Sequence, residues 1–275
     1  MFKKITKKNT RQLLSLVSIA TASLTMTNSA NATIVEFQTS QGNFKVNLFD
    51  QTTPKTVDNF LSYVNSGHYN NSIVHRVARN FVVQGGGYEF EGSFPLKRLA
   101  INDPVINEPI YSNVQGTIAM AKIGSDVNSA TDQWFFNLVD SSANLDLQNG
   151  GFTVFGQIID DPNDDDDGMA VVNKIALLNL CNTPNLSGVP VVLNAGQACN
   201  ELIAPGIENF VVIEAITIVD SSEVTDSDLN PLLSTNVKNN GTPEVTDSND
   251  SGGTTTWFTL IALTLLTIKR RLMKR

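Results

Sequence analysis

Residues 74–87 of this 275-residue chain read Val-His-Arg-Val-Ala-Arg-Asn-Phe-Val-Val-Gln-Gly-Gly-Gly. Two mostly apolar runs, Ser72–Val77 and Phe81–Gln84, predict strands. Arg76 and Gln84 lie inside these runs, so the stretch predicts a piece of sheet that carries polar groups on an otherwise apolar surface. His75 precedes Arg76 and is expected to face the opposite side of its strand, in a structural role.

Six further segments have the apolar pattern of strands. The first two alternate apolar and polar residues on either side of a Ser40–Asn43 hairpin turn. The six segments are Ile34–Gln38, Phe44–Leu48, Thr117–Ala121, Trp134–Val139, Thr153–Ile159 and Phe210–Val219.

Only two segments predict helices. One begins at Pro54, with Thr53 as its N-cap, and carries an apolar stripe formed by Val57, Phe60, Leu61 and Val64. The other covers Met169–Leu178. Eight short strands with two helices predict a mainly β fold, a closed eight-stranded antiparallel barrel capped by two α-helices.

The charge of the chain is unevenly distributed. Of its 19 Lys and Arg residues, five lie in residues 1–32 and five in residues 257–275, which leaves nine against all 27 acidic residues in between. Such an acidic domain cannot neutralise a row of phosphates, which argues against a nucleic-acid partner. Two His and two Cys residues are also too few for a His/Cys metal cluster, and we expect no metal and no cofactor.

Residues 1–32 have the three parts of a secretory signal peptide. A basic stretch runs to Arg11, an apolar core covers Leu13–Met26, and Ala30-Asn31-Ala32 offers a cleavage site. The apolar core is short for a bilayer span, which favours cleavage over anchoring. We therefore expect an exported protein of the periplasm or cell envelope, in an oxidising compartment.

The other end also carries a targeting pattern. Residues 221–256 are rich in Ser, Thr, Asn and Asp and predict a flexible linker. Residues 257–275 combine the apolar run Trp257–Ile268 with a basic end. Together with Ser251-Gly252-Gly253 they resemble the Gly-Gly C-terminal sorting signals of some Gram-negative bacteria, which implies removal by a rhomboid-type protease. An uncut tail that anchors the protein in the membrane is the alternative.

Two more motifs follow residues 74–87. Gly116–Ala121 leads through Ser129-Ala130-Thr131 to Gln133–Asn137, and Asn144-Leu145-Asp146 precedes Gly150–Gly156. In order, spacing and identity the three motifs resemble the cyclophilin-type peptidyl-prolyl cis-trans isomerases, in particular exported bacterial ones. The resemblance covers residues 33–220 and implies an isomerase domain there, with the same eight-stranded barrel and with proline-containing polypeptides as substrates. We expect a monomer.

The resemblance also implies roles for individual residues. Arg76 matches the catalytic arginine, and Gln84 matches the residue that orients this arginine and the substrate carbonyl. The proline pocket is implied at Phe81, Val82, Phe135 and Leu145. Gln133 lines the adjoining surface, and the backbone of Ala121 and Lys122 matches the strand that binds the substrate chain. Phe152 replaces a pocket histidine and Lys122 an asparagine of the best-known eukaryotic pattern.

These residue types suit the reaction. Rotating an X–Pro bond crosses a barrier of about 18–20 kcal/mol because the twisted amide loses its resonance, and no covalent bond breaks. A guanidinium beside the proline nitrogen binds the twisted state better than either planar state. The rival hypothesis is a barrel that only binds extended proline-containing segments, as a chaperone or adhesion module.

Two insertions interrupt the domain. Residues 160–168 are acidic and mimic part of a calcium loop, but Lys174 stands where the bidentate Glu belongs, so an acidic turn at a helix N-terminus is the favoured interpretation. Residues 179–206 contain Cys181 and Cys199, for which an oxidising compartment predicts a disulfide that stabilises the fold by roughly 3 kcal/mol.

Overall fold

The computed structural model describes residues 33–160, 167–181, 183–222 and 229–240. The strands of this structure are β1 Ile34–Thr39, β2 Phe44–Leu48, β3 Ser72–Ile73, β4 Arg76–Ala78, β5 Val82–Gly85, β6 Tyr88–Glu89, β7 Lys97–Arg98, β8 Thr117–Met120, β9 Trp134–Asn137, β10 Val154–Ile159, β11 Asn179–Leu180, β12 Pro190–Val191 and β13 Val212–Asp220. The helices are α1 Pro54–Asn65, α2 Ser142–Leu145, α3 Gly168–Leu177 and α4 Thr235–Asn240, with 3-10 turns η1 Gln148–Gly150, η2 Cys199–Glu201 and η3 Ile207–Asn209.

Eleven of these strands form one antiparallel sheet, in the order β4-β5-β9-β8-β10-β2-β1-β13-β3-β6-β7. The sheet closes on itself through the segment Ser72–Ala78, because its first half pairs with β13 and its second half with β5. At the junction, the Val74 N–H donates to the Val211 carbonyl and the His75 N–H to the Gln84 carbonyl. With β3 and β4 counted as one bent strand, the ring has the eight members that the sequence predicts, and β6 and β7 extend it as a side hairpin.

The barrel interior is filled by aromatic rings. Phe37 of β1 lies edge-on to Trp134 and Phe136 of β9, with ring centres 5.2 and 5.3 Å apart, and stacks on Phe44 of β2. All four rings are buried. Because this core excludes water on the inner face of the sheet, polar chemistry is confined to the outer face and to the loops.

The two predicted helices cover the barrel. α1 buries Val57, Phe60, Tyr63 and Val64 in the barrel core, and α3 buries Val171, Val172, Ile175 and Ala176. Leu61, predicted for the apolar stripe of α1, is only partly buried, and Tyr63 faces the core instead. α1 begins at Pro54 as predicted, and both ends of α3 lie one residue from the predicted Met169–Leu178. The mainly β fold with two covering helices confirms the expected fold class.

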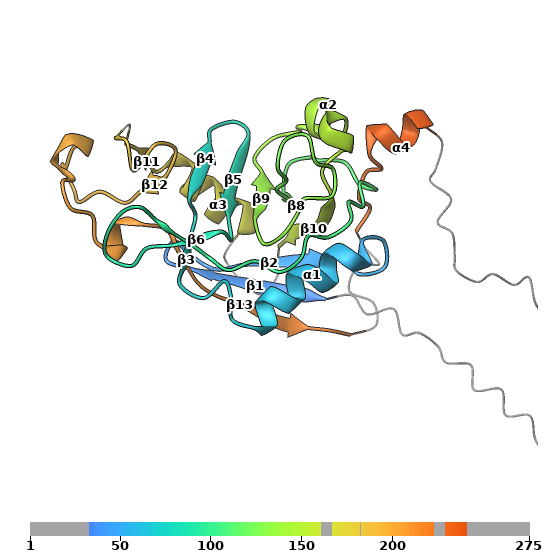
Figure 1. Ribbon diagram of the computed structural model, residues 1–275, viewed down its shortest axis with the longest axis horizontal. Helices are drawn as coiled ribbons and strands as arrows, with labels where there is room; N and C mark the ends of the chain where they lie inside the picture. The colour runs from blue at the N-terminus through green and yellow to red at the C-terminus, as the bar shows by residue number, and fades with distance from the viewer. Residues whose placement is uncertain (1–32, 161–166, 182, 223–228, 241–275) are drawn as a thin grey trace, which may run out of the picture.

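The insertion 179–206 forms a lobe beside β4 and β5 (Figure 1). Cys181 and Cys199 form the predicted disulfide, with Cα atoms 5.4 Å apart. A separate apolar cluster lies under the lobe and includes Ile73 of β3, Cys181, Leu186 and Val189. The lobe is therefore packed against the barrel.

Part of the predicted linker is packed as well, which corrects the expectation for residues 229–240. The Ser112 N–H donates to the Leu232 carbonyl and the Ser234 N–H to the Ile110 carbonyl, so this segment, here named the clasp (residues 229–237), pairs with a loop of the domain. Ser234 and Val237 are buried. The polar composition of residues 221–256 predicts a flexible linker throughout. A few buried contacts nevertheless suffice to order a segment as short as the clasp, and composition does not reveal such contacts. α4 lies at the end of the molecule opposite the disulfide lobe (Figure 1).

Several predicted segments lie outside the described residues. They are the signal peptide 1–32, most of the acidic insertion 160–168, the remaining linker residues and the tail 257–275. Within the described residues, none of the helices has the length and apolar character needed to cross a membrane.

Candidate active site

The register of four neighbouring strands builds the site. Arg76 of β4 lies opposite Gln84 of β5, Gln84 opposite Phe135 of β9, and Phe135 opposite Ala119 of β8. Residues that are directly opposite share a face of the sheet. The next row, from Val77 through Val83 and Phe136 to Ile118, belongs to the barrel core. The Arg76 row therefore faces outward.

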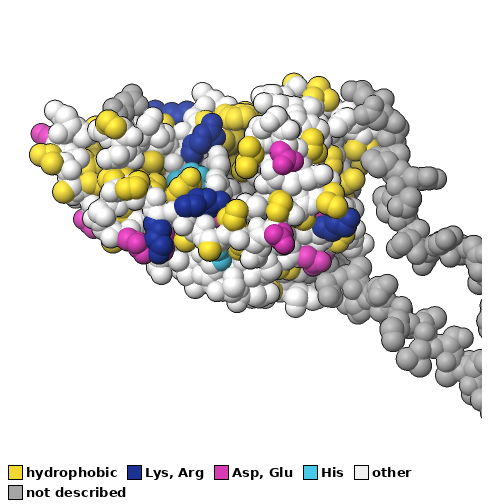
Figure 2. Space-filling model, viewed as in Figure 1, with side chains coloured by type: hydrophobic (Ala, Val, Ile, Leu, Met, Phe, Trp, Pro, Cys, Tyr) yellow, Lys and Arg dark blue, Asp and Glu magenta, His cyan; other side chains and the backbone are white. Residues whose placement is uncertain are grey.

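This outer face carries an apolar cluster of its own. Its buried members include Val82, Phe135 and Leu145, and Phe81, Ala121 and Phe152 pack against it while partly exposed. The structure thus brings together the residues that the resemblance implies for the proline pocket. Figure 2 shows hydrophobic side chains gathered beside Lys or Arg side chains in the region of β4, β5 and β9.

A tight hairpin sets Phe81 at one edge of the cluster. Ala78 pairs with Val82, so Arg79, Asn80 and Phe81 form a three-residue loop, and the Phe81 N–H donates to the Ala78 carbonyl. Asn80 has a φ of +57°, a left-handed conformation that asparagine tolerates better than most residues. This turn places Phe81 directly before β5, at the end of the hairpin away from the Arg76–Gln84 pair.

Arg76 is held by a chain of side-chain hydrogen bonds. Its Nη1 donates to Gln84 Oε1 at 3.3 Å, and Gln84 Nε2 donates to Gln133 Oε1 at 2.9 Å. Arg76 is exposed, whereas Gln84 and Gln133 are half-buried. The guanidinium therefore presents donors to a ligand over the apolar cluster while its direction is set by amides that cannot ionise.

His75 lies beside this chain, which corrects its expected position. The backbone leaves strand geometry between β3 and β4, so side-chain alternation is interrupted at His75. Its ring lies 4.8 Å from that of Tyr88. Burial lowers the pKa of His75 to about 4, although a hydrogen bond with the Gln133 side chain raises it. A neutral imidazole therefore supports Gln133 at neutral pH.

An ion pair between exposed Arg98 and buried Asp132 lies directly before Gln133 and β9. Arg98 of β7 donates two hydrogen bonds to the Asp132 carboxylate, at 2.7 and 2.8 Å, and one to the Gly87 carbonyl. Burial alone would raise the pKa of Asp132, but hydrogen bonds from Arg98 and His68 outweigh it and lower that pKa. The side hairpin of β6 and β7 thus fixes the end of the site at Gln133.

Lys122, which follows β8, ties this part of the chain to the Phe152 side of the apolar cluster. Its Nζ donates to the carbonyls of Asn149 and Gly151, at 2.8 and 2.6 Å, and lies 4.8 Å from the centre of the Phe152 ring. Burial lowers the pKa of this ammonium to about 8, while Asp126 raises it. The Phe152 ring lies edge-on to Phe135, with centres 5.8 Å apart.

The turn of Leu145 is anchored from behind. Asp146 is buried, and its Oδ1 accepts from the Asn113 N–H while its Oδ2 accepts from the Thr235 N–H of the clasp. The Phe152 N–H donates to the Leu145 carbonyl. The loop at Asn113, the clasp and the segment at Phe152 together hold Leu145 against the apolar cluster.

The described residues offer little to a metal. They contain no group of three His, Cys, Asp or Glu side chains arranged to hold an ion. Asp167 caps α3, since its carboxylate accepts from the Ala170 N–H, which is the role predicted for the acidic turn. Lys174 donates instead to the Gln41 carbonyl of the β1–β2 turn.

Comparison with known proteins identifies the family. The profile of the cyclophilin type peptidyl-prolyl cis-trans isomerase family matches residues 34–194. The chain belongs to this family. This cyclophilin is 39% identical over 175 residues to the peptidyl-prolyl cis-trans isomerase A of Dickeya dadantii, an alignment that covers 60% of this chain and 84% of that one.

Two further matches belong to the same family. The peptidyl-prolyl cis-trans isomerase B of Escherichia coli is 40% identical over 148 residues, which covers 52% of this cyclophilin and 83% of that protein. A crystal structure of a cyclophilin from Cryptosporidium parvum is 22% identical and covers 69% of this chain and 98% of that one, with a TM-score of 0.46.

Several residues around the site escape sequence reasoning. They are the Lys122 side chain, which lies over the Phe152 ring, the Arg98–Asp132 pair, which directly precedes Gln133 in the chain, and Gly188 of the disulfide lobe, which accepts a hydrogen bond from Val77 next to Arg76. Only the backbone of Lys122 was expected to matter. Arg98 and Gly188 come from a side hairpin and an insertion, whose position relative to the barrel depends on tertiary packing. No local pattern gives their partners.

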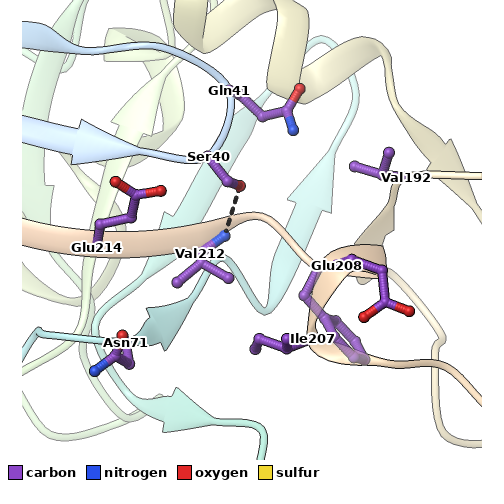
Figure 3. A pocket seen from close by; sticks show the side chains of 9 residues that line it. Ser40, Gln41, Asn71, Val192, Ile207, Glu208, Val212 and Glu214 are labelled. Atoms are coloured by element: carbon purple, nitrogen blue, oxygen red, sulfur yellow. Dashed lines mark hydrogen bonds between the residues drawn. The ribbon is translucent and has the colours of Figure 1, made fainter.

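A separate hollow of about 680 Å³ lies between the β1–β2 turn, β13 and η3, and it includes none of the predicted site residues. The Ser40 hydroxyl accepts a hydrogen bond from the Val212 N–H at its rim, at 3.1 Å (Figure 3). The Glu208 and Glu214 carboxylates lie on opposite sides of this hollow (Figure 3). They do not converge on a common point, and we assign the hollow no role.

Proposed function

We propose that this cyclophilin accelerates cis–trans isomerisation of X–Pro bonds in exported polypeptides and so assists their folding. The observation that carries the proposal is the Arg76 guanidinium, which is hydrogen-bonded to Gln84 and stands in the row of outward residues beside the apolar cluster. Uncatalysed isomerisation takes tens to hundreds of seconds, which is slow enough to limit folding.

The catalytic group in this proposal is Arg76. As the X–Pro bond twists, the proline nitrogen becomes pyramidal and its lone pair accepts a hydrogen bond. Arg76 donates that bond to the twisted state and to neither planar state, so it lowers the barrier without forming a covalent bond. Arginine suits this role because its guanidinium remains charged and offers several donors in a fixed plane.

The apolar cluster binds the proline ring. Phe81, Val82, Phe135, Leu145 and Phe152 surround the place where the ring would lie, and they exclude water from the bond that rotates. A drier environment strengthens the hydrogen bond from Arg76 and disfavours the more polar planar amide.

The strand end at Ala121 and Lys122 binds the substrate backbone. The Ala121 N–H already donates to the Gln133 carbonyl, so the hydrogen bonds to an extended substrate are assigned to the Lys122 backbone. Such main-chain pairing recognises a polypeptide without regard to its side chains.

The proposed substrates are exported polypeptides because the cyclophilin itself has features of an exported protein. The signal-like residues 1–32 and the disulfide Cys181–Cys199 both favour an oxidising compartment, the periplasm or cell envelope. The basic, apolar tail favours either membrane anchoring or processing. The mass of the mature protein decides between them, because an end at Arg275 excludes processing.

A refolding experiment tests the proposal. The cyclophilin is added to an unfolded periplasmic protein whose slow refolding phase is limited by trans-to-cis isomerisation of an X–Pro bond. Acceleration of that phase in proportion to the amount of cyclophilin is expected. An unchanged slow phase, together with measurable binding of the unfolded chain, would support the rival binding module.

A further inference from the structure

The disulfide lobe contacts the strand that carries Arg76. The Val77 N–H of β4 donates to the Gly188 carbonyl at 2.7 Å, so β4 pairs with β5 on one side and with the lobe on the other. At the next turn, Arg79 Nη2 donates to the Leu178 carbonyl at 2.9 Å. The short strand is thereby fixed just after Arg76 by contacts from outside the barrel.

Gly188 also lies beside the Arg76 side chain. A Cβ atom built on Gly188 would lie 4.0 Å from Arg76 Cγ, which is ordinary van der Waals contact. Gly188 has a φ of +79°, a conformation that favours glycine. The lobe therefore lies beside the stem of Arg76 and bonds to the next residue of β4, while Gln84 accepts a hydrogen bond from the Arg76 guanidinium.

The disulfide fixes the loop that contains Gly188. β11 pairs with β12, with Asn179 opposite Val191, and Cys181 directly follows β11. Between them, the Leu186 N–H donates to the Thr183 carbonyl and the Val189 N–H to the Leu186 carbonyl. Cys181, Leu186 and Val189 are buried against Ile73 of β3, so the bond to Cys199 lies in the core under this loop.

We propose that the disulfide-closed lobe is a positioning element for Arg76, so that the isomerase rate depends on the Cys181–Cys199 bond. The proposal rests on the proposed function, because it assigns Arg76 the catalytic role. With the bond broken, the lobe loses the covalent link that holds its loop, and the Gly188 carbonyl no longer fixes β4 next to Arg76. The lobe acts through Arg76 and does not touch the rotating bond.

The first test compares the oxidised protein with the double variant Cys181→Ser/Cys199→Ser. We expect kcat/KM for a proline peptide to fall by about three- to tenfold, mainly in kcat, at a temperature where both proteins are folded by circular dichroism. In an Arg76→Ala background the same double change should have no further effect, because the two sites act through one group.

A second test avoids any change to the cysteines. Gly188 and Gly196 both lie in the lobe and have φ values of +79° and +78°, but a Cβ atom on Gly196 would meet nothing within 4 Å. Gly188→Leu and Gly196→Leu therefore impose the same backbone strain, and only the first grows towards Arg76. Gly188→Leu should lower kcat by about threefold or more relative to Gly196→Leu.

Three results are distinguishable. A lower melting temperature with unchanged kcat/KM, in both tests, would overturn the proposal and leave the disulfide a purely stabilising role. An equal loss on removal of the cysteines with and without Arg76 would overturn it too, since the lobe would act through another group. A wild-type protein with no isomerase activity would instead overturn the proposed function.

Discussion

The Lys122 ammonium lies 4.8 Å from the centre of the Phe152 ring and donates to two carbonyls of the turn before it. One side chain thus joins the chain just after β8 to the Phe152 side of the apolar cluster. In the resemblance only the Lys122 backbone has a role. The structure adds the side chain as a link between two parts of the site.

This link predicts a loss of activity at alkaline pH. Because burial lowers the pKa of Lys122 to about 8, with Asp126 as the charged neighbour that opposes the shift, the ammonium loses its proton between pH 7 and 9.5. A neutral amine is not attracted to the Phe152 ring, and kcat/KM should fall about two- to threefold. Lys122→Arg stays charged and should give a flat profile. A decline of equal size in Lys122→Arg would contradict the assignment.

A second prediction concerns His75. Its folded-state pKa of about 4 lies below the ordinary 6.5, so between these values the unfolded chain binds a proton that the folded chain does not. Stability from this group is present above pH 6.5 and is lost as the pH falls towards 4. The imidazole NMR signals should stay constant from pH 7 to 5 and move near pH 4. A midpoint close to 6.5 would contradict the burial of this ring.

A third prediction concerns the contribution of the buried Asp132 charge, which pairs with Arg98, to the stability of the fold. Asp132→Asn should lower the free energy of unfolding by about 2 kcal/mol at pH 7, because a neutral amide replaces the buried carboxylate that accepts two charge-assisted hydrogen bonds from Arg98. The pKa of Asp132 is lowered in the fold, so the stabilisation is present above the ordinary carboxyl pKa and is lost as the pH falls through the lower folded value. The difference between wild type and variant should therefore shrink in acid.

Denaturant unfolding at pH 7 and at pH 3 measures this difference. Asp103→Asn is the matched control, because Asp103 is exposed and its loss should change stability by less than about 0.5 kcal/mol. Equal stability of wild type and Asp132→Asn at pH 7 would show that the pair contributes nothing.

The clasp provides a fourth prediction. Val237 is 6% exposed and Leu232 is 57% exposed, although both belong to the clasp. Val237→Asp buries a charge and should cost about 2–3 kcal/mol of unfolding free energy, whereas Leu232→Asp should be nearly neutral. Thermal unfolding of both variants measures the difference. If both are neutral, the segment behaves as the free linker that its composition predicts.

The barrel was predictable from the sequence because its signals are local. Alternation in residues such as Ile34–Gln38 and Phe44–Leu48 follows from one buried face, and Pro54 and Gly67 bracket α1. Two of the three site motifs lie on strands whose register brings Arg76, Gln84 and Phe135 into one row. The strand pairing that produces the alternating apolar pattern also brings these candidate site residues together.

The remaining contacts depend on packing between distant segments. The bend at His75 exists because one strand serves two edges of the closed ring, which no window of sequence reveals. Gly188 lies beside Arg76, although 112 positions separate them in the sequence. The Thr235 N–H donates a hydrogen bond to Asp146, 89 positions away. Such pairs require the fold to be known first.

The central claim is that Arg76 selects the twisted X–Pro bond, and NMR exchange spectroscopy on a tetrapeptide that interconverts between cis and trans tests it most directly. Arg76→Ala should bind the peptide about as well as wild type, because the apolar pocket is intact, while the exchange rate falls about 100- to 1000-fold. Arg76 is exposed, so the fold should be unaffected. Rapid exchange in Arg76→Ala at wild-type rates would contradict the claim.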